Sequence, residues 1–216
     1  MRAAGSSIKS IAGSLDVSPS SVSRWVRDIE LTPDQIEALR ANNPIVNGQL
    51  KGTKAMAARH RENRRAAQAE GRARACARDP FYVAGCMLYW AEGCKDRNSI
   101  RFTNSDPRMM VFFLRFLRTY FDVADDRVRV HCNLFSDSKE ERRRIEQAWL
   151  RFLGLPAACL GASTVNRYSR SSRRKRIGVL PYGTCRVTVN DTRIVQTIFG
   201  SIQELAAFER EEWLGP

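Results

Sequence analysis

The stretch from Tyr82 to Lys95, YVAGCMLYWAEGCK, constrains the fold of this chain more than any other. It is apolar over most of three helical turns, which predicts a helix buried on nearly all of its sides. Its small residues, Ala84, Gly85 and Ala91, lie on one side, and the apolar run ends at Glu92. An isolated buried carboxylate is very costly, so Glu92 must emerge where it is solvated, paired or bound to a metal. The sequence therefore marks Glu92 as a candidate functional residue, with a merely solvated terminal acid as the alternative.

The end of this stretch, LYWAEG from Leu88 to Gly93, resembles the second half of the LAGLIDADG motif of homing endonucleases and their relatives. In that family the motif helices of two modules pack face to face, and their last acids meet at divalent metals above the scissile phosphates. The resemblance implies a catalytic and metal-binding role for Glu92 if the chain is a nuclease, and a homodimer through helix 82–93. The chain departs from the motif in three ways: Glu92 replaces the usual aspartate, Met87 the first glycine, and Trp90 a frequent acid.

The charge of the chain predicts a polyanionic partner. Its 216 residues include 36 Lys and Arg against 23 Asp and Glu, a net charge of +13, with an isoelectric point near 10.1. Nucleic acid is the commonest partner of such a surface. No apolar run approaches the roughly 20 residues that span a bilayer, and the N-terminus has no signal-peptide core. We therefore expect a cytoplasmic, nucleoid-associated protein of a bacterium or phage. Its expected partner is double-stranded DNA, and no association with a membrane is expected.

The six cysteines are never closer than eight residues apart, and the chain has only two histidines, His60 and His131. Zinc fingers and ribbons need paired ligands at short spacing, so a structural zinc site is not expected. We expect reduced thiols and no cofactor, except magnesium if the protein is a nuclease.

Residues 1–44 predict a helix-turn-helix DNA-binding domain. Apolar residues at helical spacing from Ile8 to Leu15 precede Asp16 at a turn position, and Ser18 with Pro19 forms an N-cap and first helical position. The pattern resembles the helix-turn-helix of resolvases and phage regulators.

The second of these helices is expected to bury Val22, Trp25 and Val26 and to expose short hydroxyls and arginines. Such side chains can reach base edges and phosphates in the major groove. A serine-rich helical hairpin that only packs is the alternative. The expected DNA contacts are Ser20, Ser21, Arg24 and Arg27.

Residues 45–79 predict a basic helical linker. Between Gln49 and Arg78 the sequence contains nine Lys and Arg residues but only two glutamates. Its helix propensity is high, and it has too few apolar residues along one side for a core helix. We expect an arm along the phosphate backbone, with contacts from Lys51 and Lys54; a solvated tether is the alternative.

Residues 80–216 predict an α+β module with the order α, β, β, α, β, α, β, α. After the Glu92 helix we expect a hairpin over 94–104, helices over 107–122, 138–153 and 192–208, and strands over 127–134 and 185–189. Trp149 and Phe152 are expected in the core. The order resembles one LAGLIDADG module, αββαββα, with an extra helix between the third and fourth strands.

One side of these strands is apolar, and the other is polar and basic. A sheet face of this kind can enter a major groove and read bases, as the LAGLIDADG saddle does in its family. An ordinary half-exposed sheet is the alternative. The expected contacts are Arg101, Thr103, Arg129, His131, Asn133, Arg186 and Thr188.

A separate basic segment, RYSRSSRRKR over 167–176, has six cations in ten residues. It predicts a loop that grips phosphates, and a solvated loop is the alternative. The expected contacts are Arg173, Arg174, Lys175 and Arg176.

Two functional classes follow from the sequence. The first is a transcriptional regulator with two DNA-reading elements; actinobacterial sporulation regulators that combine an inactive LAGLIDADG module with a helix-turn-helix are a precedent. The second is a magnesium-dependent, homing-type DNA endonuclease that dimerises to bring two Glu92 carboxylates together. Because Glu is one methylene longer than Asp and magnesium demands near-ideal geometry, we favour the regulator. A phage or mobile-element recombination accessory protein is a further alternative.

Overall fold

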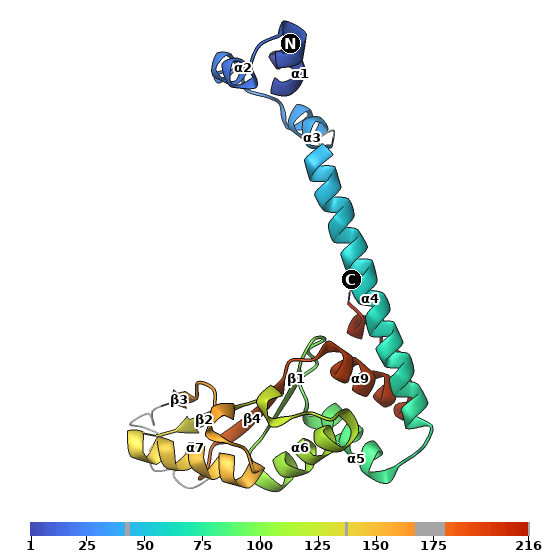
Figure 1. The fold of residues 1–216 in the computed structure, drawn as a ribbon, viewed down its shortest axis with the longest axis vertical. Helices are drawn as coiled ribbons and strands as arrows, with labels where there is room; N and C mark the ends of the chain where they lie inside the picture. Colours follow the sequence, from blue (N-terminus) through green and yellow to red (C-terminus); the bar gives the residue numbers. More distant parts are fainter. Residues whose placement is uncertain (42–43, 137, 167–179, 216) are drawn as a thin grey trace. The chain divides into compact units, whose positions relative to one another are not determined.

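The computed structural model describes residues 1–41, 44–136, 138–166 and 180–215, without the side chains of residues 44–51. The chain divides into two units, Met1–Arg59 and His60–Pro216. It has an α+β architecture, in which a long helix, α4 (Pro44–Ala75), belongs to both units (Figure 1).

The first unit begins with a short 3-10 helix (Arg2–Ala4) and then contains α1 (Ile8–Leu15), α2 (Pro19–Trp25), α3 (Pro33–Ala41) and the first part of α4. The Ser7 hydroxyl accepts a hydrogen bond from the Ser10 N–H at the start of α1. Asp16 adopts the left-handed conformation with φ 52°, and Ser18 accepts from the Ser21 N–H at the start of α2. The predicted helices, turn and cap are therefore confirmed at the predicted residues.

The core of the first unit is small. Ile11, Ala12 and Val22 are buried, with Ile8, Val17 and Val26 packed beside them. The prediction that Trp25 is buried is wrong, since 60% of it is exposed. Trp25 is the last residue of α2, and the side of the helix that faces α1 is already filled by Val22 and Val26.

The second unit contains four further α-helices and a four-stranded sheet among the described residues. The core is lined by the apolar sides of these elements, with Phe102, Phe113, Trp149 and Phe199 fully buried. In chain order the elements are α5 (Pro80–Glu92), β1 (Ile100–Asn104), α6 (Pro107–Phe121), β2 (Val128–Phe135), α7 (Lys139–Leu153), β3 (Thr164–Asn166), β4 (Thr184–Val189) and α9 (Thr192–Ala206), with 3-10 turns at Asp125–Arg127, Ala157–Cys159 and Glu211–Trp213.

The strands are arranged in the order β1-β4-β2-β3. The pairs β1–β4 and β4–β2 are antiparallel, whereas β2 and β3 are parallel. Helices α5 and α6 contact β1, α6 also contacts β4, and α7 contacts β2. Since the apolar strand residues are the buried ones, these helices cover one face of the sheet.

The sequence predictions for this unit need three corrections. The expected hairpin is reduced to a single bridge between Gly93 and Phe102, because Lys95 and Asp96 form turn contacts instead of a strand. The short strand β3 was not predicted. Phe152 is 39% exposed, since it lies on the outer side of α7, where its ring packs edge-on against Trp149.

The second half of α4 packs against α9 of the second unit, whereas the sequence predicts an arm along the phosphate backbone or a solvated tether. A Cβ atom on Gly71 would lie 1.9 Å from the Thr197 carbonyl oxygen, and one on Gly200 would lie 2.0 Å from that of Gln68. The backbones of α4 and α9 are therefore in direct contact. The Gln68 amide donates to Gln196 Oε1 over 2.7 Å and its Oε1 accepts from Gln203 over 3.1 Å. The contact is made by glycines and glutamines, so a search for an apolar stripe does not find it.

Within the part of the chain described here, no helix is both long enough and apolar enough to cross a membrane.

Candidate nucleic-acid interface

The outward side chains of β1, β4 and β2 form rows across the open face of the sheet. The pairing register places Thr188 between Arg101 and Arg129, and Arg186 between Thr103 and His131. All of these residues are exposed or half-buried. The structure therefore brings the predicted sheet residues together on one surface, and we call this surface the open sheet face. Its remaining predicted member, Asn133, lies in a third row.

The third row contains residues that the sequence analysis missed. Thr184 of β4 and Thr164 of β3 are paired with Asn133 from either side. The Asn166 amide donates to Asn133 Oδ1 over 3.0 Å. Because β3 is only three residues long and begins in an irregular segment, it has no recognisable alternation in sequence. The only signal in the sequence of β3 is its Thr and Asn residues, which indicate a position on the polar face of the sheet.

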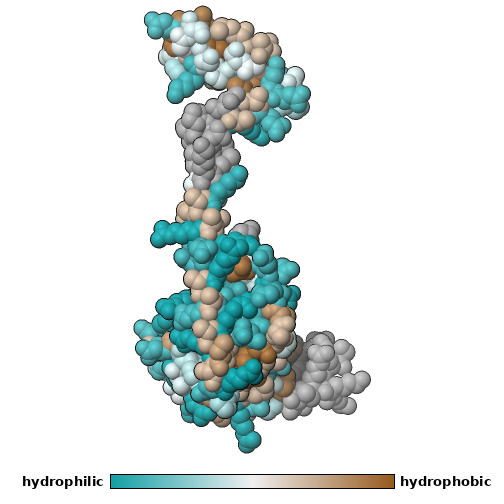
Figure 2. Space-filling view, turned by 90° about the vertical axis from the view of Figure 1, so that its right-hand side faces the viewer, coloured by the Kyte–Doolittle hydropathy of each residue, from teal (hydrophilic) through white to brown (hydrophobic). Residues whose placement is uncertain are grey.

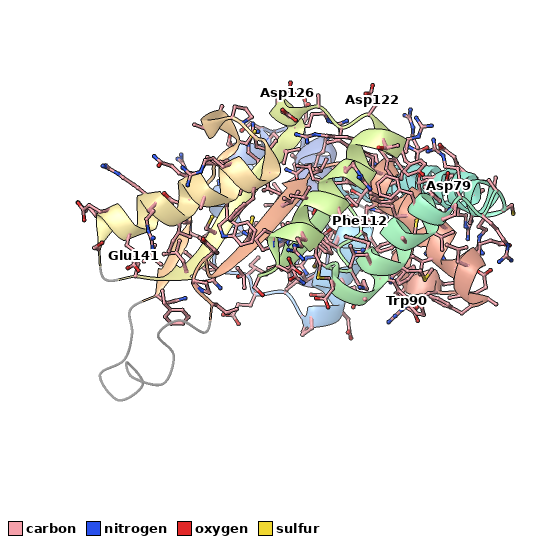
Figure 3. All side chains as sticks on the ribbon, turned by 90° about the horizontal axis from the view of Figure 1, so that it is seen from below. Asp79, Trp90, Phe112, Asp122, Asp126 and Glu141 are labelled. Atoms are coloured by element: carbon pink, nitrogen blue, oxygen red, sulfur yellow. The ribbon has the colours of Figure 1, made fainter. Side chains whose placement is uncertain are left out.

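The open sheet face is not covered by the helices that pack on the other side. Figure 3, seen from below, shows α5, α6 and α7 in front of the strands. The buried positions of β2, which are Val128, Val130, Cys132 and Leu134, alternate with the outward ones. One face of the sheet thus packs against the helices, and the other face is open to solvent.

The three arginines of the open sheet face differ in their partners. Arg101 Nη2 lies 2.7 Å from the Asp96 carboxylate, and Arg129 Nη1 donates to the carbonyl oxygens of Asp126 (2.7 Å) and Val128 (2.9 Å). Arg186 has no ion pair with any residue that the structure describes. The pKa of Asp96 is lowered, first by the backbone N–H of Asn98 and also by the charge of Arg101. Arg186, in the central strand, is therefore the cation that is most available to a ligand.

His131 lies at the boundary between the open sheet face and the segment that follows the Cys159 turn. Its Nδ1 is 3.3 Å from the carbonyl oxygen of Ala162. A Cβ on Gly161 would lie 2.5 Å from the imidazole ring. The glycine thus allows the backbone to pass directly beside the ring, which limits the positions open to His131.

In the first unit, α2 and the turn after it present the predicted hydroxyls and arginines. Ser20, Arg24 and Arg27 are exposed, and Ser21 is half-buried. The Ser18 hydroxyl is 2.7 Å from that of Ser20 and 2.9 Å from that of Ser21. The serine hydroxyls therefore already have partners in the free protein, whereas Arg24 extends from α2 and Arg27 from the turn that follows it.

The basic residues of α4 divide into two groups. Lys54 and Arg59 are exposed, and the side chain of Lys51 lies outside the described atoms. Further along, Arg61 is bonded to the Gly215 carbonyl oxygen, Arg64 donates to that of Leu214 over 2.8 Å, and Arg72 is 2.6 Å from the Glu209 carboxylate. Figure 2 shows a pale apolar line between hydrophilic side chains along this helix. Arg61, Arg64 and Arg72 are thus occupied within the second unit, and phosphate binding by the exposed cations of α4 stays a prediction.

The predicted loop contacts Arg173, Arg174, Lys175 and Arg176 lie outside the described residues.

Glu92 is the last residue of α5 and is exposed to solvent. Within the described ranges, no group of three or more His, Cys, Asp or Glu side chains is placed to hold a metal ion.

The Lys95 ammonium donates to the carbonyl oxygens of Trp90 (2.7 Å) and Gly93 (2.6 Å). It thereby satisfies carbonyl groups at the end of the helix, which is a structural role. Burial lowers the pKa of Lys95.

Comparison of the chain with protein-family models, with curated proteins and with solved structures found no match.

Proposed function

We propose that this chain is a sequence-specific double-stranded DNA-binding protein of the cytoplasm that acts as a transcriptional regulator. Residues 8–27 would act as a helix-turn-helix, and residues 80–216 as a LAGLIDADG-like module whose sheet contacts DNA. The observation that carries the proposal is the open sheet face, with three arginines and no acid at the outward positions of its three rows.

The dimensions of the open sheet face suit a major groove. Neighbouring strands are about 4.8 Å apart, so the paired side chains of β4 and β2 occupy well under the groove width of about 12 Å. Arg186 can bond a guanine bidentately, and Asn133 an adenine, whereas Arg101 and Arg129 at the edge of the surface are suited to phosphates. The face combines base-reading and backbone-binding groups, as specific recognition requires.

A second contact through α2 would raise the affinity. One small DNA-binding module buries only about 600–1,000 Å² and binds weakly by itself. Two modules on one chain raise the effective concentration of each near the DNA. The chain offers both, with Arg24 and Arg27 in the first unit and the open sheet face in the second.

Selection from random duplexes tests the proposal and separates it from the nuclease alternative. We expect a preferred site to be enriched and to remain uncut with magnesium or manganese. Recovery of no preferred site would contradict the proposal. Specific double-strand cleavage that Glu92→Ala abolishes would instead assign the chain to the endonucleases, with Glu92 as a metal ligand.

Arg24 and the loop cations should affect binding differently. We expect Arg24→Ala to reduce the preference for the selected site over random duplex by roughly 5- to 100-fold, because a base contact contributes about 1–3 kcal/mol. Changing Arg173, Arg174, Lys175 and Arg176 together to alanine should weaken binding to all duplexes and reduce the salt slope by about 3 to 4. Fluorescence anisotropy over a salt series measures both effects. Equal losses on specific and random DNA in both variants would contradict separate roles.

A further inference from the structure

Two of the six cysteines lie directly opposite one another in the sheet. The register pairs Cys132 of β2 with Cys185 of β4 on adjacent antiparallel strands. Both are buried, with 1% and 0% of their surface exposed, and both are free thiols. Opposed residues of this kind have Cα atoms about 4.5–5.5 Å apart, which is within the range of about 4.4–6.8 Å found in disulfides. A disulfide can therefore form with only a small movement of the strands.

The remaining cysteines have no such neighbour. Cys76 and Cys94 are exposed, Cys86 is buried in α5, and Cys159 donates its thiol hydrogen to the Asp125 carbonyl oxygen over 3.1 Å. None of these four belongs to the strand pairs of the sheet. The juxtaposition is thus specific to Cys132 and Cys185.

The two thiols differ in acidity. A hydrogen bond from the Cys185 thiol lowers the pKa of Cys132, although burial opposes this. The pKa of Cys185 is raised, first by the same hydrogen bond and then by burial. Cys132 is therefore the sulfur that ionises, and Cys185 retains its hydrogen. A more acidic thiol beside a second, resolving thiol is one of the features of a redox-active pair.

A polar group of side chains lies beside Cys132. The Glu146 carboxylate accepts from Arg142 Nε over 2.8 Å and from the Ser163 hydroxyl over 2.6 Å. Arg142 and Ser163 are half-buried, so this group connects the buried sulfur with the solvent beside β2. A small polar oxidant such as hydrogen peroxide would reach the sulfur through this group.

We propose that Cys132 and Cys185 form a peroxide-reactive modification site that closes to a disulfide between β2 and β4. The Cys132 thiolate attacks one peroxide oxygen, an S–O bond forms, the O–O bond breaks, and the departing hydroxide takes up a proton to become water. The Cys185 sulfur then attacks the sulfenic sulfur of Cys132, an S–S bond forms, the S–O bond breaks, and a second water leaves. Two thiols are oxidised and one peroxide is reduced.

The disulfide would alter the open sheet face from the buried side of the same two strands. Cys132 lies between His131 and Asn133 in sequence, and Cys185 lies between Thr184 and Arg186. Drawing the two sulfurs together changes the local twist of the strands and hence the spacing of the outward side chains. An effect on DNA rests on the proposed function, whereas the chemistry of the pair does not.

Peptide mapping of the full chain before and after treatment with hydrogen peroxide tests the site. We expect a crosslinked peptide pair containing Cys132 and Cys185, a mass loss of two hydrogen atoms, and reversal by dithiothreitol. In Cys185→Ser, dimedone added together with denaturant after the peroxide treatment should label Cys132, because no thiol remains to resolve the sulfenic acid and unfolding exposes it to the reagent. The exposed Cys94→Ser variant is the matched control and should form the disulfide at the wild-type rate.

Three outcomes would overturn the inference: a peroxide-treated wild type without the Cys132–Cys185 peptide, dimedone labelling confined to Cys76 and Cys94, or a disulfide with another cysteine. Mapping of the wild type decides the matter even if Cys185→Ser does not fold. Binding to the selected duplex is measured separately, and we expect oxidation to weaken it at least threefold. A disulfide that leaves DNA affinity unchanged would overturn only the inferred effect on binding, and a chain that binds no DNA would count against the proposed function alone.

Discussion

Gly200→Ala is expected to destabilise the second unit by about 3 kcal/mol, which is a large part of the stability of a typical domain. The new methyl group would lie 2.0 Å from the Gln68 carbonyl oxygen and 2.6 Å from the carbonyl and Cα carbons of the same residue. These are backbone atoms in the middle of α4, so a change of side-chain rotamer cannot relieve the overlap, and the two helices must move apart. Thermal unfolding should show a midpoint lower by roughly 6–12 °C.

Gly52→Ala provides the control for this prediction. Gly52 also lies in α4, but a Cβ at this position meets nothing within 4 Å. Alanine is favoured over glycine in a helix by up to about 1 kcal/mol, so this variant should be neutral or slightly stabilising. Equal stability of Gly200→Ala and the wild type would show that α4 and α9 do not touch through their backbones.

Arg186→Glu is expected to weaken binding to the selected duplex by about 100-fold. The change removes a cation from the middle of the open sheet face and places a carboxylate where it meets bases or phosphates. Loss of a bidentate base contact accounts for about 1–3 kcal/mol, and repulsion adds to it. Since Arg186 has no described ion pair within the protein, its replacement should leave the unfolding temperature nearly unchanged.

Arg143→Glu makes the same change of charge on a different surface. Arg143 is an exposed residue of α7, which covers the opposite face of the sheet. In the proposed complex Arg143 lies far from the duplex, so its charge acts on the DNA only at long range and is screened by salt. We therefore expect Arg143→Glu to lower the affinity for DNA by no more than about threefold at physiological salt. Equal losses in the two variants would mean that net charge, and not the open sheet face, determines binding.

The elements of the second unit that depend on local signals could be predicted from the sequence. Asp106 and Ser138 cap α6 and α7 as expected, because an N-cap depends only on the next three residues. The alternation in β2 predicted which side chains are buried, because one face of the strand lies against the core. The predicted members of the open sheet face therefore meet on one surface.

The features that depend on partners distant in sequence could not be predicted. The packing of α4 on α9 uses Gly71 and Gly200, which are far apart in sequence and have no side chains to show a pattern. The pairing of β3 with β2 adds Thr164 and Asn166 to the surface through a segment too short for alternation. Trp25 was assigned to the core from its spacing alone, although the small first unit has no room for its indole.

The glutamines between α4 and α9 also determine how the two helices align. Gln68 donates to Gln196 and accepts from Gln203, and Ser201 donates to the carbonyl oxygen of Gly71 over 2.9 Å. Sliding α4 by one helical turn, about 5.4 Å, would leave these groups unbonded in the interior and would place Ala67 or Ala75 where Gly71 meets α9. The hydrogen bonds and the glycine contact thus favour one register of α4 against α9 over the registers shifted by a helical turn. The second unit accordingly begins near residue 60, well before the apolar helix from which its fold was first inferred.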